Sequence, residues 1–187
     1  VEKIQAVGGM AEPLVFNVAD GAAMDTALTK IARVHGRLDI LVNNVGMRDR
    51  RTIDEVEATD FDALLQVNLT AVYALSRSVA AFMRAQHAGR IINMSALASA
   101  VGLPHGPSYA ASKGGLEALT RMLSVSLGQY GITVNAISPG YFATETNATM
   151  QADETLRHKL EDTTSRRRWG QPQEIAGPAV YLSLIHL

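Results

Sequence analysis

Residues 38–46 read Leu-Asp-Ile-Leu-Val-Asn-Asn-Val-Gly, an apolar run of strand length that ends in two asparagines and a glycine. A nearly continuous apolar run of this kind is typical of a strand in a parallel sheet that is covered on both faces. Before it, apolar residues recur at helical spacing between Asp20, which can cap a helix, and Gly36, which can end one. Residues 38–42 are therefore expected to leave a helix and enter a buried sheet.

The same alternation of strand and helix continues along the chain in both directions. Short apolar runs alternate with longer stretches in which apolar residues recur every three or four positions. Strand–helix alternation with short connections favours a doubly wound α/β fold, in which helices cover both faces of a parallel sheet. We expect strands at 13–18, 38–42, 90–94 and 132–137, and helices at 1–7, 20–36, 60–87, 109–130 and 172–186.

The composition excludes several classes of protein. The chain has 187 residues, enough for one domain with a real core, and its formal net charge of −1 provides no chain-wide basic field for nucleic acid or anionic membrane. It has no cysteine, which excludes disulfide frameworks and thiolate metal sites, and its 5 histidines share no ligand spacing. No apolar run reaches the roughly 20 residues of a membrane helix, and no export signal is visible. We expect one soluble, cytoplasmic domain over residues 1–187, without a metal.

The most specific local pattern is Tyr-Ala-Ala-Ser-Lys at residues 109–113. On a helix, Tyr109 and Lys113 lie one turn apart on the same face, where the ammonium group favours the phenolate form of the tyrosine. Such a tyrosine can exchange a proton with an alcohol or carbonyl oxygen. Taken alone, the pattern is more often a half-buried tyrosine beside a solvated lysine, so its meaning depends on the rest of the chain.

Polar residues follow the predicted strands at their carboxyl ends, where ligands bind in open parallel sheets. The segments concerned are Asn-Asn-Val-Gly at 43–46, Ile-Ile-Asn-Met-Ser at 91–95 and Asn-Ala-Ile-Ser-Pro-Gly at 135–140, and Val-Asn-Leu-Thr at 67–70 lies inside a predicted helix. In this order, together with the Tyr109/Lys113 pair, they resemble the short-chain dehydrogenase/reductase family of NAD(P)-dependent oxidoreductases. The resemblance covers essentially the whole chain.

The resemblance implies a Rossmann-type sheet, NAD or NADP as cofactor, and a small-molecule carbonyl or alcohol substrate. It implies that Tyr109 is the catalytic general acid/base, that Lys113 assists it and binds the nicotinamide ribose, and that Asn68 holds a water of the proton relay. It also implies a homodimer or homotetramer, because the helices at 60–87 and 109–130 carry apolar residues on more than one face. The implied cofactor contacts are Asn17 and Val18 by the adenine, Asn44 and Gly46 by the adenosine half, and Tyr109, Lys113, Pro139, Gly140, Phe142 and Thr144 nearer the nicotinamide.

One position departs from the family in the catalytic machinery. The family's catalytic serine, thirteen residues before the tyrosine, falls on Ala96. Ser95 is one residue too early and would point away from the substrate unless the strand bulges, because side chains alternate along a strand, and Ser99 could reach in only from the loop. Losing one donor to the developing oxyanion costs roughly 100–1,000-fold in rate. Ala96 therefore predicts a slow enzyme or a relocated donor.

The family's Gly-rich phosphate-binding turn has no counterpart in the sequence. Gly8 and Gly9 precede an extended segment, and Gly114 and Gly115 lie in a helix beyond Lys113. The family strands on either side of that turn, and its last strand, have no counterpart either. We therefore expect a sheet that is incomplete at both ends, in a fragment of a longer protein or the product of a truncated gene. Residues 13–18 must then pair directly with residues 38–42 or remain unpaired.

Two groups of arginines bear on the substrate. Arg48, Arg50 and Arg51 follow the Asn-Asn-Val-Gly turn, and three more occupy residues 166–168. They are either solvated loop residues or cationic donors for an anionic or polyhydroxylated substrate. Residues 140–146 and 168–170 are similar to sugar-acid members of the family such as gluconate 5-dehydrogenases. The alternative, favoured by Ala96 and the missing phosphate turn, is a non-catalytic member that senses a ligand or binds a partner.

Overall fold

The computed structural model describes residues 1–184, in which three strands alternate with helices. The strands are β1 (Ile40–Asn43), β2 (Gly89–Met94) and β3 (Ile132–Ile137). The helices are α1 (Glu2–Gln5), α2 (Gly21–His35), α3 (Ala58–Leu65), α4 (Ala71–Gln86), α5 (Pro107–Leu127), α6 (Ala148–Ala152), α7 (Glu154–Thr163) and α8 (Ala176–Ser183).

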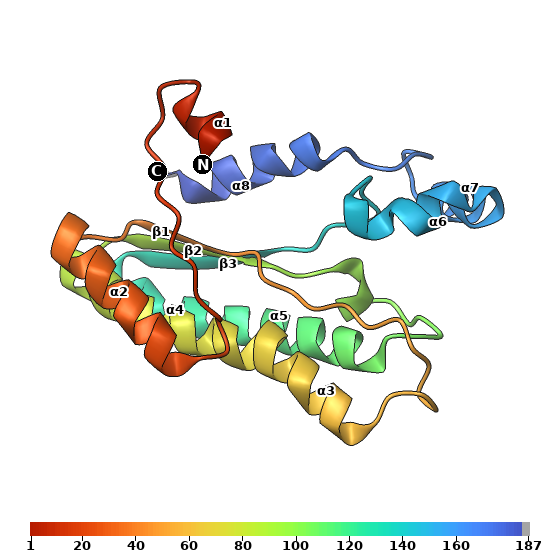
Figure 1. The fold of residues 1–187 in the computed structure, drawn as a ribbon, viewed down its shortest axis with the longest axis horizontal. Coiled ribbons are helices and arrows are strands. Elements are labelled where there is room, and N and C mark those ends of the chain that lie inside the picture. Colours follow the sequence, from red (N-terminus) through yellow and green to blue (C-terminus); the bar gives the residue numbers. More distant parts are fainter. Residues whose placement is uncertain (185–187) are drawn as a thin grey trace.

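The strands form one parallel sheet in the order β1-β2-β3, in which Ile40 pairs with Arg90 and Gly89 pairs with Ile132. Helices α2, α3, α4 and α5 lie on one side of this sheet, and α8 lies on the other (Figure 1). Helices connect each strand to the next, as a parallel sheet requires. The predicted α/β arrangement, with helices on both faces, is the one observed.

The main core lies between the sheet and helices α2, α4 and α5. Ile91 and Ile132 point from the strands into this layer and meet Val79 and Met83 of α4, all of them essentially inaccessible to solvent. Burying a side chain of this size stabilises the fold by about 1.5–3 kcal/mol. The opposite face is less covered, because α8 packs on β2 and β3 and leaves Ile40 of β1 46% exposed.

Helix α2 begins and ends where the sequence predicts. The Asp20 carboxylate accepts hydrogen bonds from the backbone N–H groups of Ala22 and Ala23 at 3.0 and 3.1 Å. Gly36 ends the helix in the left-handed region at φ +68°, which glycine adopts without a steric penalty. The Asp20 cap stabilises α2 by about 1 kcal/mol. After the turn at Gly36 the chain enters β1.

The strand predicted at residues 13–18 is wrong, because this segment has no regular secondary structure. It runs from α1 on one side of the sheet to α2 on the other (Figure 1). Val15 is 97% exposed, and Phe16 alone in the segment packs partly against the core. A strand forms only where a neighbouring strand satisfies its backbone donors and acceptors, and the apolar run itself supplies no such neighbour. Of the two outcomes expected for residues 13–18, the unpaired one is observed.

The helix predicted at residues 60–87 is two helices, α3 and α4, joined by a π turn at Gln66–Thr70. A π turn widens the helix by one residue and is frequent at functional sites. Here it surrounds Asn68, which is fully buried. The spacing of apolar residues continues through the turn, so the sequence pattern does not reveal it.

The remaining predicted helices differ from the observed ones at their ends. The helix predicted at 1–7 is limited to α1, and the one predicted at 109–130 is α5 followed by a 3₁₀ turn. The helix predicted at 172–186 is a 3₁₀ turn followed by α8, and its residues 185–186 lie outside the described residues. The sequence patterns do not predict α6 and α7, which lie beyond the ends of the strands (Figure 1).

Within residues 1–184, no helix combines the length and apolar character needed to cross a membrane. The cytoplasmic location expected from the composition stays a prediction.

Candidate active site

A cavity of about 500 Å³ opens at the carboxyl ends of the strands. Its walls come from the segments that follow β1, β2 and β3, from the first two turns of α5, and from the chain near α6 and α8. Open parallel sheets bind ligands at this edge. Eight of the residues proposed from the sequence line this cavity: Asn44, Gly46, Tyr109, Lys113, Pro139, Gly140, Phe142 and Thr144.

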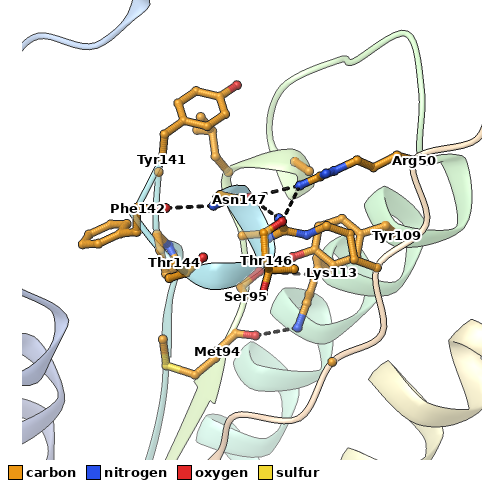
Figure 2. Close-up of a pocket in the computed structure, with 18 of the residues that line it drawn as sticks. Arg50, Met94, Ser95, Tyr109, Lys113, Tyr141, Phe142, Thr144, Thr146 and Asn147 are labelled. Carbon is orange, nitrogen blue, oxygen red and sulfur yellow. Dashed lines mark hydrogen bonds between the residues drawn. The ribbon is translucent and has the colours of Figure 1, made fainter. Parts of the chain in front are cut away.

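Lys113 is the buried cation of the cavity. It is 4% exposed, and its Nζ donates a 2.7 Å hydrogen bond to the carbonyl oxygen of Met94 at the end of β2 (Figure 2). Burial, and then the positive charge of Arg48, lower the pKa of Lys113 to about 8. An ammonium group has three N–H donors, and the Met94 carbonyl is the one hydrogen-bond acceptor that residues 1–184 provide for it.

Tyr109 lies one helical turn before Lys113 on α5, as the sequence spacing predicts. Two cations flank its ring, with Lys113 Nζ 5.8 Å and Arg48 Cζ 5.5 Å from the ring centroid. Each contact of this kind contributes about 0.5–1 kcal/mol at exposed sites and more where water is excluded. The tyrosine side chain is thereby held in the cavity between positive charges from two separate segments.

Asn68 lies beneath the cavity and does not line it. Its Oδ1 accepts a 2.7 Å hydrogen bond from the backbone N–H of Met47, and its Nδ2 donates to the Met47 carbonyl at 2.9 Å and to Ser112 Oγ at 3.1 Å. The side chain is therefore a clamp on the backbone just after Gly46. A Cβ atom at Gly46 would lie 3.6 Å from Lys113 Nζ, an ordinary van der Waals distance, so the clamped turn is close to the lysine. The water-holding role of Asn68 stays a prediction.

Asn17 and Val18 lie away from the cavity. Neither residue lines it, and Asn17 Oδ1 accepts a 3.0 Å hydrogen bond from the N–H of Ala19 in the turn before α2. Their expected contact with the adenine stays a prediction.

The serines near the missing catalytic position all contact one carboxylate. Ser95 Oγ, Ser99 Oγ and Ser138 Oγ lie 2.9, 2.6 and 2.6 Å from Glu117 Oε1. These hydrogen bonds, that from Ser138 first, lower the pKa of Glu117. The Ser95 hydroxyl is therefore turned toward Glu117 of α5, although Ser95 and Ala96 both line the cavity. Both serines that could replace the hydroxyl absent at Ala96 are therefore hydrogen-bonded to Glu117.

Two arginines of the segment after β1 meet at a residue that the sequence analysis did not identify. Asn147 is 7% exposed, and its Oδ1 accepts hydrogen bonds from Arg48 at 2.6 Å and Arg50 at 3.1 Å. Its Nδ2 donates to the Phe142 carbonyl at 2.9 Å, and Arg50 also donates to the carbonyl of Thr146 at 3.1 Å (Figure 2). Neither arginine pairs with a carboxylate within residues 1–184. No sequence motif marks Asn147, because the two arginines that bind it are 97 and 99 residues away.

The other arginines do not contribute to the cavity. Arg51 pairs with Asp49 at 2.6 Å and with Asp60 at 2.8 Å, and Arg168 pairs with Glu174 at 2.7 Å. The predicted group of cationic donors is therefore reduced to Arg48 and Arg50. The chain after Arg168 is nevertheless joined to the cavity wall, because Phe142 and Gly170 form a parallel β-bridge.

Comparison with known proteins establishes the family. Residues 1–184 match the family described as Enoyl-(Acyl carrier protein) reductase. The chain is 38% identical over 183 residues to 5-keto-D-gluconate 5-reductase of Escherichia coli K12, covering 98% of this chain and 72% of that protein. The chain belongs to the short-chain dehydrogenase/reductase family. The predicted family, and with it the prediction of an enzyme of this family, is confirmed.

Other short-chain dehydrogenases/reductases share the fold and nearly the whole length of the chain. Gluconate 5-dehydrogenase of Gluconobacter oxydans is 36% identical over 179 residues, covering 96% of this chain and 70% of that protein. The structure of a gluconate 5-dehydrogenase from Burkholderia cenocepacia, in complex with NADP and tartrate, has a TM-score of 0.92 at 36% identity and covers 97% of this chain and 71% of that chain. NAD+-bound xylitol dehydrogenase has a TM-score of 0.89 at 26% identity, covering 97% of this chain and 75% of that chain. The Rossmann-type fold is confirmed, and the predicted cofactors are those of the solved relatives.

Replacing Asn68 with alanine should release the backbone of Met47. The Met47 N–H and C=O groups would lose their hydrogen bonds to Asn68 at a position that is 49% exposed. A hydrogen bond of this kind contributes about 0.5–1.5 kcal/mol. We expect hydrogen–deuterium exchange at the Met47 amide to accelerate by roughly tenfold or more. The matched control, Ser112→Ala, removes the third hydrogen bond of Asn68 and the bond from Ser112 Oγ to the Tyr109 carbonyl, and should leave the Met47 amide protected. Unchanged exchange at Met47 in Asn68→Ala would refute the clamp.

Proposed function

We propose that the cavity is the active site of an NAD(P)-dependent oxidoreductase that interconverts a carbonyl and an alcohol group on a sugar acid. The observation that carries the proposal is the convergence of Tyr109 and the buried Lys113 with Arg48 and Arg50. A tyrosine beside an ammonium group suits proton exchange with a substrate oxygen. The guanidinium group of Arg50, which has no carboxylate partner within residues 1–184, suits the carboxylate of an anionic substrate. Relatives named for gluconate and 5-keto-D-gluconate support the same substrate class.

The residues around Lys113 fit the nicotinamide–ribose part of the cofactor. The ammonium group has N–H donors left for ribose hydroxyls, and Gly46 lines the cavity beside it. The bound dinucleotide supplies or accepts the hydride, and the protein supplies position and charge. The further residues that we propose for this part of the cofactor line the same cavity: Asn44, Pro139, Gly140, Phe142 and Thr144.

In this proposal, Tyr109 Oη gives a proton to the substrate oxygen during reduction and takes it back during oxidation. Lys113, with a pKa of about 8, is mostly charged at neutral pH and stabilises the phenolate formed when Tyr109 loses its proton. Asn68 acts as a positioning residue through its clamp on Met47. All of these residues are assigned to one domain over residues 1–187.

A second candidate function is a family member that binds its ligands without catalysis. Ala96 favours it, because this position provides no hydroxyl and the nearby serines are engaged by Glu117. Such a protein would bind a dinucleotide or a sugar acid but would not oxidise NADH or NADPH with any carbonyl substrate.

The test is steady-state reduction of 5-keto-D-gluconate, with uncharged D-fructose for comparison, by the protein expressed from its complete reading frame. We expect NADH or NADPH oxidation, and we expect Arg50→Gln to raise the KM for the keto acid by roughly 10–100-fold, because a charge-assisted hydrogen bond contributes about 1.5–3 kcal/mol. The KM for D-fructose should change little. The control Arg51→Gln, which removes an arginine paired outside the cavity, should leave both KM values unchanged.

No oxidation of either nicotinamide cofactor by the wild type, despite measurable dinucleotide binding, would favour the non-catalytic alternative. Equal KM changes for both substrates in Arg50→Gln would contradict the sugar-acid assignment.

We also propose that α4 and α5 form a contact between two copies of the chain. Both helices present large apolar side chains to solvent, with Tyr73 43%, Met122 50% and Val125 84% exposed. One face of each helix already packs on the sheet, so this second apolar surface is available to a partner. A two-fold axis would bring identical helices together and bury these residues on both copies.

Sedimentation velocity tests this contact. We expect the wild type to sediment as a dimer or tetramer and Val125→Glu to shift it toward monomer, because an unpaired carboxylate is costly to bury. Val180→Glu is the matched control, since Val180 is 57% exposed on α8, at the opposite side of the sheet. A wild type that is monomeric at micromolar concentration would contradict the proposed contact.

A further inference from the structure

We propose that Arg48 is a catalytic residue whose guanidinium group donates a hydrogen bond to the substrate oxygen that exchanges a proton with Tyr109. This assignment rests on the proposed function of the cavity. It identifies the group that stabilises the charge on the reacting oxygen, a role that no serine in the site can perform.

The serine hydroxyls are excluded by their partners. Ser95 Oγ donates to Glu117 at 2.9 Å, and Ser99 Oγ lies 2.6 Å from the same carboxylate oxygen and 2.7 Å from the Ala96 carbonyl. A hydroxyl has a single hydrogen to donate, and a charged acceptor holds it more strongly than a neutral one. A substrate oxygen would have to displace Glu117 to recruit either serine.

Arg48 lies beside Tyr109. Its Cζ is 5.5 Å from the centre of the Tyr109 ring, and its positive charge helps to lower the pKa of Lys113, so the three side chains share one site. One guanidinium nitrogen donates to Asn147 at 2.6 Å, which fixes the group at the cavity wall. Within residues 1–184, the remaining N–H groups of Arg48 have no hydrogen-bond partner and no carboxylate faces them.

The chemistry of an arginine matches this position. In reduction, the carbonyl carbon gains a hydride while the π electron pair of the C=O bond moves to oxygen, which takes the proton from Tyr109 Oη. The substrate is reduced, the nicotinamide dinucleotide is oxidised, and Tyr109 is left as phenolate until solvent returns a proton. A guanidinium group keeps its protons throughout, so Arg48 donates a hydrogen bond without competing with Tyr109 as the acid.

Arg48 and Arg50 therefore have different roles. Arg50 is bound to Asn147 and to the Thr146 carbonyl at 3.1 Å, whereas Arg48 contacts the ring of the proton donor. An anchor for a substrate carboxylate contributes equally to substrate and transition state and so changes KM. A donor to the reacting oxygen contributes most in the transition state and so changes kcat.

The test compares Arg48→Gln and Arg48→Lys with the wild type, on 5-keto-D-gluconate and on uncharged D-fructose. We expect Arg48→Gln to lower kcat by roughly 100–1,000-fold on both substrates, with KM within about threefold of the wild type. Arg48→Lys should retain part of the activity. Ala96→Ser should restore kcat at least about tenfold in Arg48→Gln, because the two donors serve the same oxygen.

Equilibrium binding supplies a readout that is independent of turnover. We expect the dissociation constants for NADPH and for D-gluconate, measured separately by calorimetry, to be within about threefold of the wild type in Arg48→Gln, with an unchanged circular dichroism spectrum. A raised dissociation constant for D-gluconate, or a KM increase confined to the keto acid with kcat preserved, would show an anchor and overturn the proposal. An unchanged kcat, or no rescue by Ala96→Ser, would overturn it as well. A wild type that binds NADPH but never oxidises it would overturn the proposed function, and this assignment with it.

Discussion

The hydrogen bond from Lys113 Nζ to the Met94 carbonyl joins the two elements on which the cavity depends, helix α5 and the carboxyl end of β2. It holds an ammonium group in a position that is 4% exposed, where burial disfavours the charged form. Because folding lowers the pKa of Lys113 to about 8, the charged lysine destabilises the folded state below that pH, and this cost is relieved as the pH rises toward the unfolded value of roughly 10.4. A site that maintains a buried cation at such a cost is suited to a function that uses it.

The segments around Lys113 and Tyr109 place the other polar residues of the site. The π turn places Asn68 where it holds the Met47 backbone, next to Gly46 at the cavity wall. Glu117, one helical turn after Lys113, accepts hydrogen bonds from the hydroxyls of Ser95 and Ser99. The segment after β1 provides the nearby cationic donors Arg48 and Arg50, and both are hydrogen-bonded to Asn147. In the proposed assignment, positive charge takes the place of a neutral hydroxyl donor at the reacting position.

The sequence predicted the features that depend on local pattern. The caps of α2 at Asp20 and Gly36, the three observed strands and the one-turn spacing of Tyr109 and Lys113 all follow from short-range chemistry. Features that depend on distant partners were missed or mistaken. Residues 13–18 have the composition of a strand but no neighbouring strand, and Asn147 acquires its role from arginines nearly a hundred residues away. The engagement of Ser95 by Glu117 likewise requires β2 and α5 to be in contact before it can be seen.

We infer that burial and the charge of Arg48 together lower the pKa of Lys113 to about 8 beside Tyr109. Direct titration of Lys113 tests it, by NMR of 13Cε-labelled lysine with Lys113→Met used to assign the resonance. We expect the titration midpoint of Lys113 to lie near its pKa of about 8 in the wild type. In Arg48→Gln the midpoint should be higher, because removing a neighbouring positive charge favours the ammonium form. A midpoint at roughly 10.4, the value of an unperturbed lysine, or one that does not respond to Arg48→Gln, would contradict it.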